Sequence, residues 1–263
     1  MIIYSEKEIR AIRSSNQIVA KILAELKKMI KPGVQTKELD EYAEMRTRAM
    51  GAIPAFKGYR GYPSSLCTSI NEEIVHGIPS SRKFQEGDIV SLDFGVFYDG
   101  YYGDAAVTYP VGKINERART LVETAEKAFY KGLEQMKPEK RISDISFAIQ
   151  NYVEAEGFSV IRTFVGHGIG LSLHEEPQVP NFGSPGRGPK IKPGMVLAIE
   201  PMIAVGDWNV EILDDNWTAV TRDKSLSAHY EHTVAITQEG ADILSLFDEK
   251  DEIFLCFKES QHA

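Results

Sequence analysis

The chain has 263 residues, of which 43% are hydrophobic and 26% are charged. This composition is typical of a globular protein with a substantial core, and it excludes disordered, collagen-like and coiled-coil classes. The 30 basic and 38 acidic residues give a formal net charge of −8. We therefore expect no nucleic acid as a partner, because nucleic-acid binders need a basic face.

No apolar run approaches the ~20 residues of a membrane-spanning helix, and the first residues lack the pattern of a signal peptide. The sequence therefore predicts a cytoplasmic protein with no membrane partner. Its two cysteines, Cys67 and Cys256, support neither a disulfide scaffold nor a cysteine-rich zinc module.

Four amphipathic helices are predicted in chain order. The first starts at the capping box formed by Ser5 and Glu8 and continues to about Met29. The second starts at the cap Thr36 and stops at Gly51. Helical spacing of apolar residues indicates two more helices, over about 115–136 and 143–156.

Apolar and β-branched residues predict strands over 88–97, 101–109, 195–204, 217–221 and 231–237. Asp99-Gly100 indicates a two-residue hairpin turn between the first two strands, because both residues tolerate a positive φ. Residues 181–194 are rich in Gly and Pro, and predict a surface loop.

An internal repeat connects the two halves of the chain. Lys31-Pro32 recurs as Lys137-Pro138 and Gly51 as Gly157, each 106 residues later, and the segment 86–93 recurs as 193–200. We therefore predict one domain, residues 1–263, built from related halves at about 31–109 and 137–237, with the N-terminal helix as an addition. Within this repeat Asp93 matches Glu200, and Asp104 matches Glu231.

The hairpin register predicts where the acidic residues lie. A two-residue turn places Asp104 opposite Gly95, so that Asp93 is its diagonal neighbour on the adjacent strand. The backbones of the two residues would then be roughly 7–8 Å apart. A bulge at Gly95 would break this register. The same geometry in the second half would bring four carboxylates together, which suits two divalent metals ~3.5–4 Å apart. The alternative is that these acids face solvent or form ion pairs.

The six histidines have different expected environments. His167 lies among glycines, in an expected turn that lets the backbone approach a site closely. Each of the others has a structural explanation on its own; His229 and His232 flank Glu231 and are expected to face the other side of the strand, and His262 belongs to a polar tail. Cys67 is expected to be a small buried hydrophobe, and Trp217 by default a core residue.

Together these motifs resemble the type I methionine aminopeptidases, which are pita-bread metallopeptidases. The resemblance spans about residues 5–247. Besides Cys67, it rests on Ser-Ile-Asn-Glu followed by His-Gly-Ile-Pro, on His-Glu-Glu-Pro, and on five residues that look like the family's metal ligands: Asp93, Asp104, His167, Glu200 and Glu231.

The resemblance implies an α/β (α+β) pita-bread fold, with two halves related by a pseudo-two-fold axis. A curved, mainly antiparallel sheet would be covered by helices, with a dinuclear metal site at the seam. It implies a metal-dependent exopeptidase that removes the initiator methionine, preferring a small second residue, by two-metal activation of a bridging water. The cofactors would be two divalent ions (Co, Mn, Fe or Zn), with a monovalent cation near Asn71, Glu73 and Ser227.

The resemblance also implies roles for individual residues. Glu200 would be the general base, His76 would contact the scissile amide nitrogen, and His174 would stabilise the carbonyl oxygen. The methionine side chain would bind among Phe56, Tyr59, Tyr62, Cys67, Phe164, Leu173 and Trp217.

Two alternatives remain, namely an Xaa-Pro-type aminopeptidase of the same fold and a non-catalytic peptide-binding relative. The first usually carries an additional N-terminal domain, and the second usually loses metal ligands. Type II enzymes have a helical insertion for which the interval from Glu200 to Glu231 leaves no room. The expected partners are N-termini of nascent polypeptides near the ribosome, and the expected state is a monomer.

Overall fold

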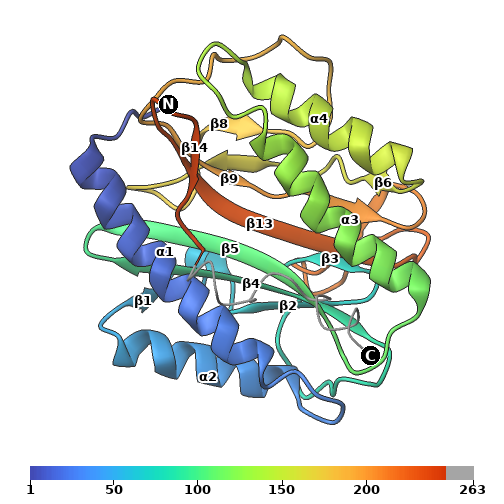
Figure 1. Cartoon of the computed structure of the whole chain (residues 1–263). Coiled ribbons are helices and arrows are strands. Elements are labelled where there is room, and N and C mark those ends of the chain that lie inside the picture. Colours follow the sequence, from blue (N-terminus) through green and yellow to red (C-terminus); the bar gives the residue numbers. More distant parts are fainter. Residues whose placement is uncertain (247–263) are drawn as a thin grey trace, which may run out of the picture.

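The structure is a computed structural model that describes residues 1–246, so Cys256 and His262 lie outside the described residues. The four expected helices are present as α1 (Glu6–Lys27), α2 (Thr36–Ala49), α3 (Glu116–Leu133) and α4 (Ile142–Ala155) (Figure 1). None of the helices in the described part of the chain is both long and apolar enough to cross a membrane.

Helix α1 begins at the predicted capping box. The Ser5 N–H donates to the Glu8 carboxylate at 2.7 Å, and the Glu8 N–H donates back to the Ser5 hydroxyl. The start of α2 differs from the prediction, because its N-cap is Gln35, and Thr36 is the first helical residue. The Thr36 hydroxyl instead accepts the Ser80 N–H at 2.8 Å, and so ties the helix to a loop.

Within residues 1–246 the main sheet has eleven strands, all paired antiparallel. Its central order is β1-β4-β5-β13-β9-β7-β8, and a second sheet has the order β11-β12-β3. The strands are β1 (Ile53–Pro54), β2 (Cys67–Ile70), β3 (Glu73–Val75), β4 (Ile89–Tyr98), β5 (Tyr101–Pro110), β6 (Ser159–Val160), β7 (Gly166–Gly168), β8 (Glu175–Val179), β9 (Val196–Ile199), β10 (Met202–Ala204), β11 (Val210–Ile212), β12 (Ala219–Thr221), β13 (Ser227–Ile236) and β14 (Ala241–Ile243).

The β4–β5 hairpin follows the sequence prediction, and residues 181–194 form the expected loop without a helix or strand. The predicted strand 195–204 is divided into β9 and β10 at Glu200-Pro201, because proline has no N–H to continue the ladder. The strand predicted at 231–237 begins earlier, at Ser227. The strand predicted at 217–221 is shorter, because Trp217 and Thr218 lie in a turn held by Asp215.

The offset of the sequence repeat recurs between structural elements. Helices α2 and α4 start at residues 36 and 142 and end at 49 and 155, an offset of 106 at both ends. The isolated bridges Gln35–Lys83 and Arg141–Lys190 stand at matching places before and after them. Helices α1 and α3 also end 106 residues apart, at 27 and 133. Helix α1 is therefore the counterpart of α3, not the addition that the sequence suggested.

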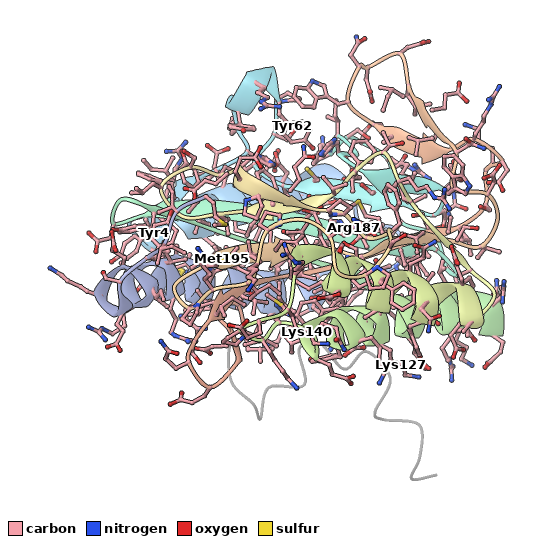
Figure 2. The ribbon with its side chains drawn as sticks, turned by 90° about the horizontal axis from the view of Figure 1, so that it is seen from above. Tyr4, Tyr62, Lys127, Lys140, Arg187 and Met195 are labelled. Carbon is pink, nitrogen blue, oxygen red and sulfur yellow. The ribbon has the colours of Figure 1, made fainter. Side chains whose placement is uncertain are left out.

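Helices α1, α3 and α4 lie on one side of the sheet, whereas Tyr62 lies on the other (Figure 2). The large apolar core lies between the helices and the sheet. Helix α1 approaches β5 very closely at Gly103, where an added Cβ would lie 2.7 Å from the Asn16 backbone nitrogen. There the Asn16 side chain accepts the Asp104 N–H at 3.2 Å. The helix layer thus supports the backbone of Asp104 from behind.

We expect Gly103→Ala to lower the free energy of unfolding by about 1–3 kcal/mol, because the methyl group would push α1 away from β5. Chemical denaturation of the purified variant measures this. Ser14→Ala, on the exposed face of the same helix, is the control and should change the value by less than about 0.5 kcal/mol. Equal effects of the two substitutions would contradict the close helix–strand contact.

Candidate active site

The four acidic residues of the sequence prediction lie together on the sheet face away from α1, α3 and α4. Gly95 is opposite Asp104 in an unbroken ladder, so the expected register is confirmed and no bulge interrupts it. Asp93 on β4 and Glu231 on β13 are both register partners of Ala106 on the intervening β5. The two hairpin carboxylates and Glu231 therefore occupy three adjacent strands.

His167 lies at the centre of β7, between β9 and β8, which corrects the expected turn. Its flanking glycines are required for close packing of the sheet. A Cβ at Gly166 would lie 2.4 Å from the Ala198 carbonyl oxygen, and one at Gly168 would lie 2.6 Å from the Glu176 carbonyl oxygen. The sequence signal was correct, but its cause is close strand pairing and not a turn.

Glu200 follows the last residue of β9, at the interruption of the strand by Pro201. Its backbone carbonyl accepts an N–H of the Asn181 side chain at 2.9 Å, which fixes this end of the strand. Its Oε1 lies 3.5 Å from Nε2 of His167. Glu200 thus joins the same cluster from the second half of the chain.

The cluster has the composition of a metal centre. Asp104, His167 and Glu231 each offer one ligand atom, and these atoms lie within 4.8 Å of one another. One buried oxygen on each of the four acids has no hydrogen-bond partner among the described residues: Asp93 Oδ1, Asp104 Oδ1, Glu200 Oε1 and Glu231 Oε1. Buried polar atoms normally have a partner, and carboxylate oxygens with an imidazole suit divalent metals such as Mn, Fe, Co or Zn. These residues therefore fit a metal site.

Burial and mutual repulsion raise the pKa values of the four carboxyl groups. Burial raises the pKa of Asp93 to about 7. Burial and then the charge of Asp93 raise the pKa of Asp104 and of Glu200 well above the ordinary values. The pKa of Glu231 is raised by burial and then by Asp104. Without a cation, the cluster therefore holds protons that a bound metal would displace.

His167 has the tautomer of a metal ligand. Its Nδ1 lies 3.0 Å from the Gly168 carbonyl oxygen, which can only accept, so Nδ1 carries the proton. Burial lowers the pKa of the ring to about 4, so the ring is neutral near pH 7. Nε2, which faces the acids, is then left with a free lone pair.

His174 stands beside His167. Its ring centroid is 4.2 Å from that of His167, and its Nδ1 is 2.9 Å from the Tyr59 hydroxyl, on whose ring it stacks. Burial, and then the neighbouring His167, lower its pKa to about 3. The neutral ring is thus held in one orientation by Tyr59.

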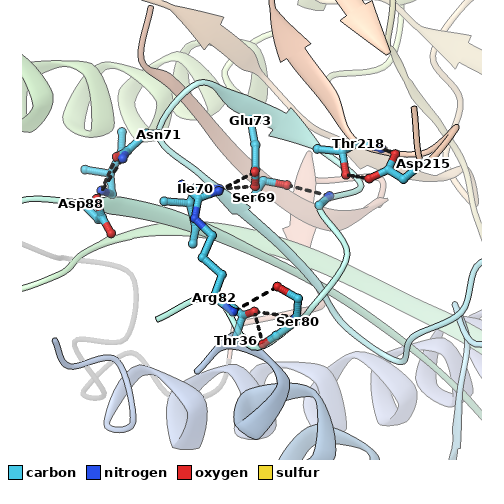
Figure 3. A network of polar contacts seen from close by, with 12 residues as sticks. Thr36, Ser69, Ile70, Asn71, Glu73, Ser80, Arg82, Asp88, Asp215 and Thr218 are labelled. Carbon is cyan, nitrogen blue, oxygen red and sulfur yellow. Dashed lines mark hydrogen bonds and ion pairs between the residues drawn. The ribbon is translucent and has the colours of Figure 1, made fainter. Parts of the chain in front are cut away.

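The segment after β3 carries His76 to a cavity that the four acidic residues also line. Glu73 receives a hydrogen bond from Arg82 at 2.7 Å, and the Ser69 hydroxyl accepts the Gly77 N–H at 3.1 Å (Figure 3). The backbone of His76 has a φ of 61°, a conformation that few non-glycine residues adopt. The contacts on both sides of the residue hold this strained turn in place.

An aromatic pocket adjoins the acidic cluster. Trp217 packs edge-on against Tyr62 and His76, and Phe164 packs edge-on against His76. The Tyr62 hydroxyl donates to the Gly77 backbone carbonyl at 3.0 Å. Because the polar end of the side chain is engaged in this way, its ring presents an apolar surface to the pocket. Trp217 is half-buried here, where the default expectation was the core.

One cavity of about 580 Å³ joins the pocket to the cluster, and all fourteen residues of the sequence prediction line it. They are Phe56, Tyr59, Tyr62, Cys67, His76, Asp93, Asp104, Phe164, His167, Leu173, His174, Glu200, Trp217 and Glu231. Cys67 is buried as expected. Arg60, Val75, Thr163, Val165 and Gln178 also line the cavity, and no sequence signal indicated them.

His229 is the main error of the sequence prediction. It lines the cavity, and its Nε2 lies 3.8 Å from Oε2 of Glu231 and 3.9 Å from Oε2 of Glu200. A residue two positions from Glu231 along a strand points to the same face, so the period of two was the signal. His232, one position away, does face the other side, where it contacts the Ser245 hydroxyl at 2.6 Å.

Comparison with known proteins agrees with this geometry. The family model "Metallopeptidase family M24" matches residues 10–238. The chain belongs to this family of metallopeptidases. It is therefore a metal-dependent hydrolase of the pita-bread fold, as the sequence predicted.

Among curated relatives, methionine aminopeptidase 1 of Bacillus subtilis is 55% identical over 91% of this chain and 96% of its own length. The crystal structure of methionine aminopeptidase from Thermotoga maritima superposes with a TM-score of 0.92 at 46% identity, over 94% of this chain and 99% of that chain. A prolidase from Pyrococcus horikoshii gives a TM-score of 0.77 at 26% identity, and this chain covers 65% of it.

The raised pKa of Asp93 predicts a pH dependence for the metal-free protein. Between pH 3.8 and about pH 7, Asp93 keeps a proton in the folded state that it has lost in the unfolded chain. The free energy of unfolding therefore falls as the pH rises through this window. We expect Asp93→Asn, which cannot titrate, to lose less of its melting temperature between pH 5 and pH 7.5 than the parent does.

Thermal melts of chelator-treated protein at both pH values measure this difference. Adding a divalent cation at pH 7.5 should raise the melting temperature of the parent. Parallel pH curves for parent and variant would contradict the buried, protonated Asp93.

Proposed function

We propose that this protein is a methionine aminopeptidase, which removes the N-terminal methionine from proteins and peptides whose second residue is small. The single observation that carries the proposal is the joining of an acidic cluster and an aromatic pocket in one cavity. The relatives that match nearly their whole length to this chain are named for this activity.

Five residues would hold the metals: Asp93, Asp104, His167, Glu200 and Glu231. Two divalent cations bound there would polarise the scissile carbonyl and lower the pKa of a water molecule. The free, unprotonated α-amine of a peptide N-terminus would serve as a further ligand of this centre, so that only the first residue reaches the pocket. This explains an enzyme that removes one residue from the end of a chain.

Glu200 is proposed as the general base. Its buried carboxyl group has a raised pKa in the metal-free protein, and a carboxylate here accepts a proton from the attacking water. His174 would donate from Nε2 to the developing negative charge on the carbonyl oxygen. The Tyr59 hydroxyl, 2.9 Å from Nδ1, supports this tautomer by donating to Nδ1. His76 would contact the scissile amide nitrogen.

The pocket suits an unbranched thioether. Tyr62, Cys67 and Trp217 present aromatic and sulfur surfaces, with which the polarisable sulfur of methionine packs favourably. Phe56, Tyr59, Phe164 and Leu173 complete its wall. Substrates with methionine first should therefore be favoured over those with a charged first residue.

The alternatives have less support. This chain is 26% identical to the prolidase, against 55% for the methionine aminopeptidase of Bacillus subtilis. A non-catalytic role is disfavoured because all five ligand residues and both outer histidines line the same cavity.

The proposal extends to finer features. These are the identity of the metals, one catalytic domain over residues 1–263, a monomer in the cytoplasm, and nascent chains near the ribosome as substrates. A monovalent cation near Asn71, Glu73 and Ser227 also belongs to the proposal. The Asn71 side chain donates to the Asp88 carboxylate at 2.9 Å (Figure 3). The backbone carbonyl of Asn71 accepts the Ser227 N–H.

We expect Glu200→Gln to abolish turnover without unfolding the protein, because the amide cannot accept the proton. His174→Ala should lower kcat by about 10²–10⁴-fold, the usual effect of a positioned acid, base or oxyanion donor. Steady-state kinetics on a methionyl peptide, at a saturating concentration of metal, measure the rates of both variants. Near-normal rates in either variant would contradict the proposed roles.

Substrate class is tested with the chelated protein and Mn, Fe, Co or Zn added singly. We expect cleavage of a Met-Gly tripeptide and no cleavage of an Ala-Pro tripeptide. Cleavage of the Ala-Pro peptide alone would favour the Xaa-Pro alternative, and cleavage of neither would favour a binding protein.

A further inference from the structure

His229 is buried beside the acidic cluster and has no role in the mechanism above. It lies on β13, two residues before Glu231, with 1% of its surface exposed. Its backbone is fixed, because its N–H donates to the Thr108 hydroxyl at 2.9 Å and its carbonyl accepts from the same hydroxyl at 2.8 Å. The direction of the ring toward the cluster is therefore set by the sheet.

The ring nitrogens lack the partners that a buried imidazole normally has. Neither Nδ1 nor Nε2 makes a hydrogen bond with any described residue. Burying a polar group without a partner is costly, and within a functional site it indicates that a ligand completes the environment. His232 is buried in the same strand, and its Nδ1 lies 2.6 Å from the Ser245 hydroxyl. The contrast distinguishes His229 from an ordinary structural histidine.

The distances around Nε2 suit a shared cation better than a hydrogen bond. Nε2 is 3.9 Å from Oε2 of Glu200 and 3.8 Å from Oε2 of Glu231, both too long for a hydrogen bond. Two ligands of one divalent cation, each about 2.1 Å from it, lie at most about 4.2 Å apart. Both distances are within this limit.

Glu200 stands between two imidazoles. Its Oε1 is 3.5 Å from Nε2 of His167, and its Oε2 is 3.9 Å from Nε2 of His229. Each oxygen of one carboxylate therefore faces a different ring nitrogen. Glu200 and the two imidazoles would therefore take part in one metal centre.

We propose that His229 is a sixth ligand of the metal centre and supplies it with a second nitrogen through Nε2. The inference rests on the proposed function only in that the cluster binds divalent cations. A second imidazole raises the preference of the centre for Zn over Mn, because imidazole suits the former and oxygen ligands the latter.

The direct test is X-ray absorption at the zinc edge of protein loaded with two zinc ions per chain, because imidazole ligands have a distinct scattering signature. The wild-type protein should show an average of about one imidazole per zinc, that is, two per pair of ions. An average of about one half would leave His167 as the sole nitrogen ligand and would overturn the proposal. This measurement needs no variant, so it does not depend on the folding of one.

His229→Gln provides the second arm. Its imidazole count should fall to about one half per zinc, and its zinc affinity, measured by titration calorimetry, should fall at least about 10-fold, with a smaller change for manganese. His174→Ala is the matched control, since it removes another imidazole that lines the same cavity but is no proposed ligand, and its count should match wild type. An unchanged count in His229→Gln would also overturn the proposal.

Peptidase assays separate this inference from the proposed function. If metal-loaded wild type cleaves Met-Gly peptides but shows one half imidazole per zinc, only the His229 proposal fails. If it shows one imidazole per zinc but cleaves no peptide, only the proposed function fails.

Discussion

Four acidic residues that line one cavity, with their carboxyl groups buried, form the constraint on which the rest of the structure depends. Together they would carry four negative charges at the centre of a sheet, which water cannot stabilise there. The raised pKa values show that the protein alone resolves this by keeping protons, with Asp93 at about 7. Divalent cations bound there would resolve it differently, because they would replace the protons and supply an electrophilic centre for hydrolysis.

The frame that holds this cluster is built twice. Asp93 and Asp104 stand on a hairpin of the first half, and Glu200 and Glu231 stand at corresponding places in the second half. Strand β13 joins them, because it pairs with β5 on one side and with β9 on the other. Asp93, Asp104, His167 and Glu231 lie within paired strands, and Glu200 directly follows β9. The helices support those strands from one side. Rigid placement keeps repelling groups together when the metal is absent.

Much of this was predictable from local sequence, and the reasons differ by residue. The turn at Asp99-Gly100 fixed the register of the first hairpin, and with it the relation between Asp93 and Asp104, because a two-residue turn leaves little freedom. The repeat extended that result to Glu200 and Glu231. The grouping of His76, His174 and the aromatic residues in one cavity came from family resemblance, since long-range contacts such as that of His174 with Tyr59 have no local signature. Glycines around His167 signalled a close approach, but not that the approach was between strands.

His229 shows where the interpretation went wrong. The alternation of strand side chains was applied to both His229 and His232, although only His232 is one position away from Glu231.

The central claim is that the carboxylates hold protons until cations replace them. The direct measurement is calorimetric titration of the metal-free, chelator-treated protein with Mn²⁺ or Co²⁺ near pH 6.5. Repeating it in buffers of different ionisation enthalpy gives the number of protons released. The account predicts net proton release on binding. Binding without proton release would contradict it.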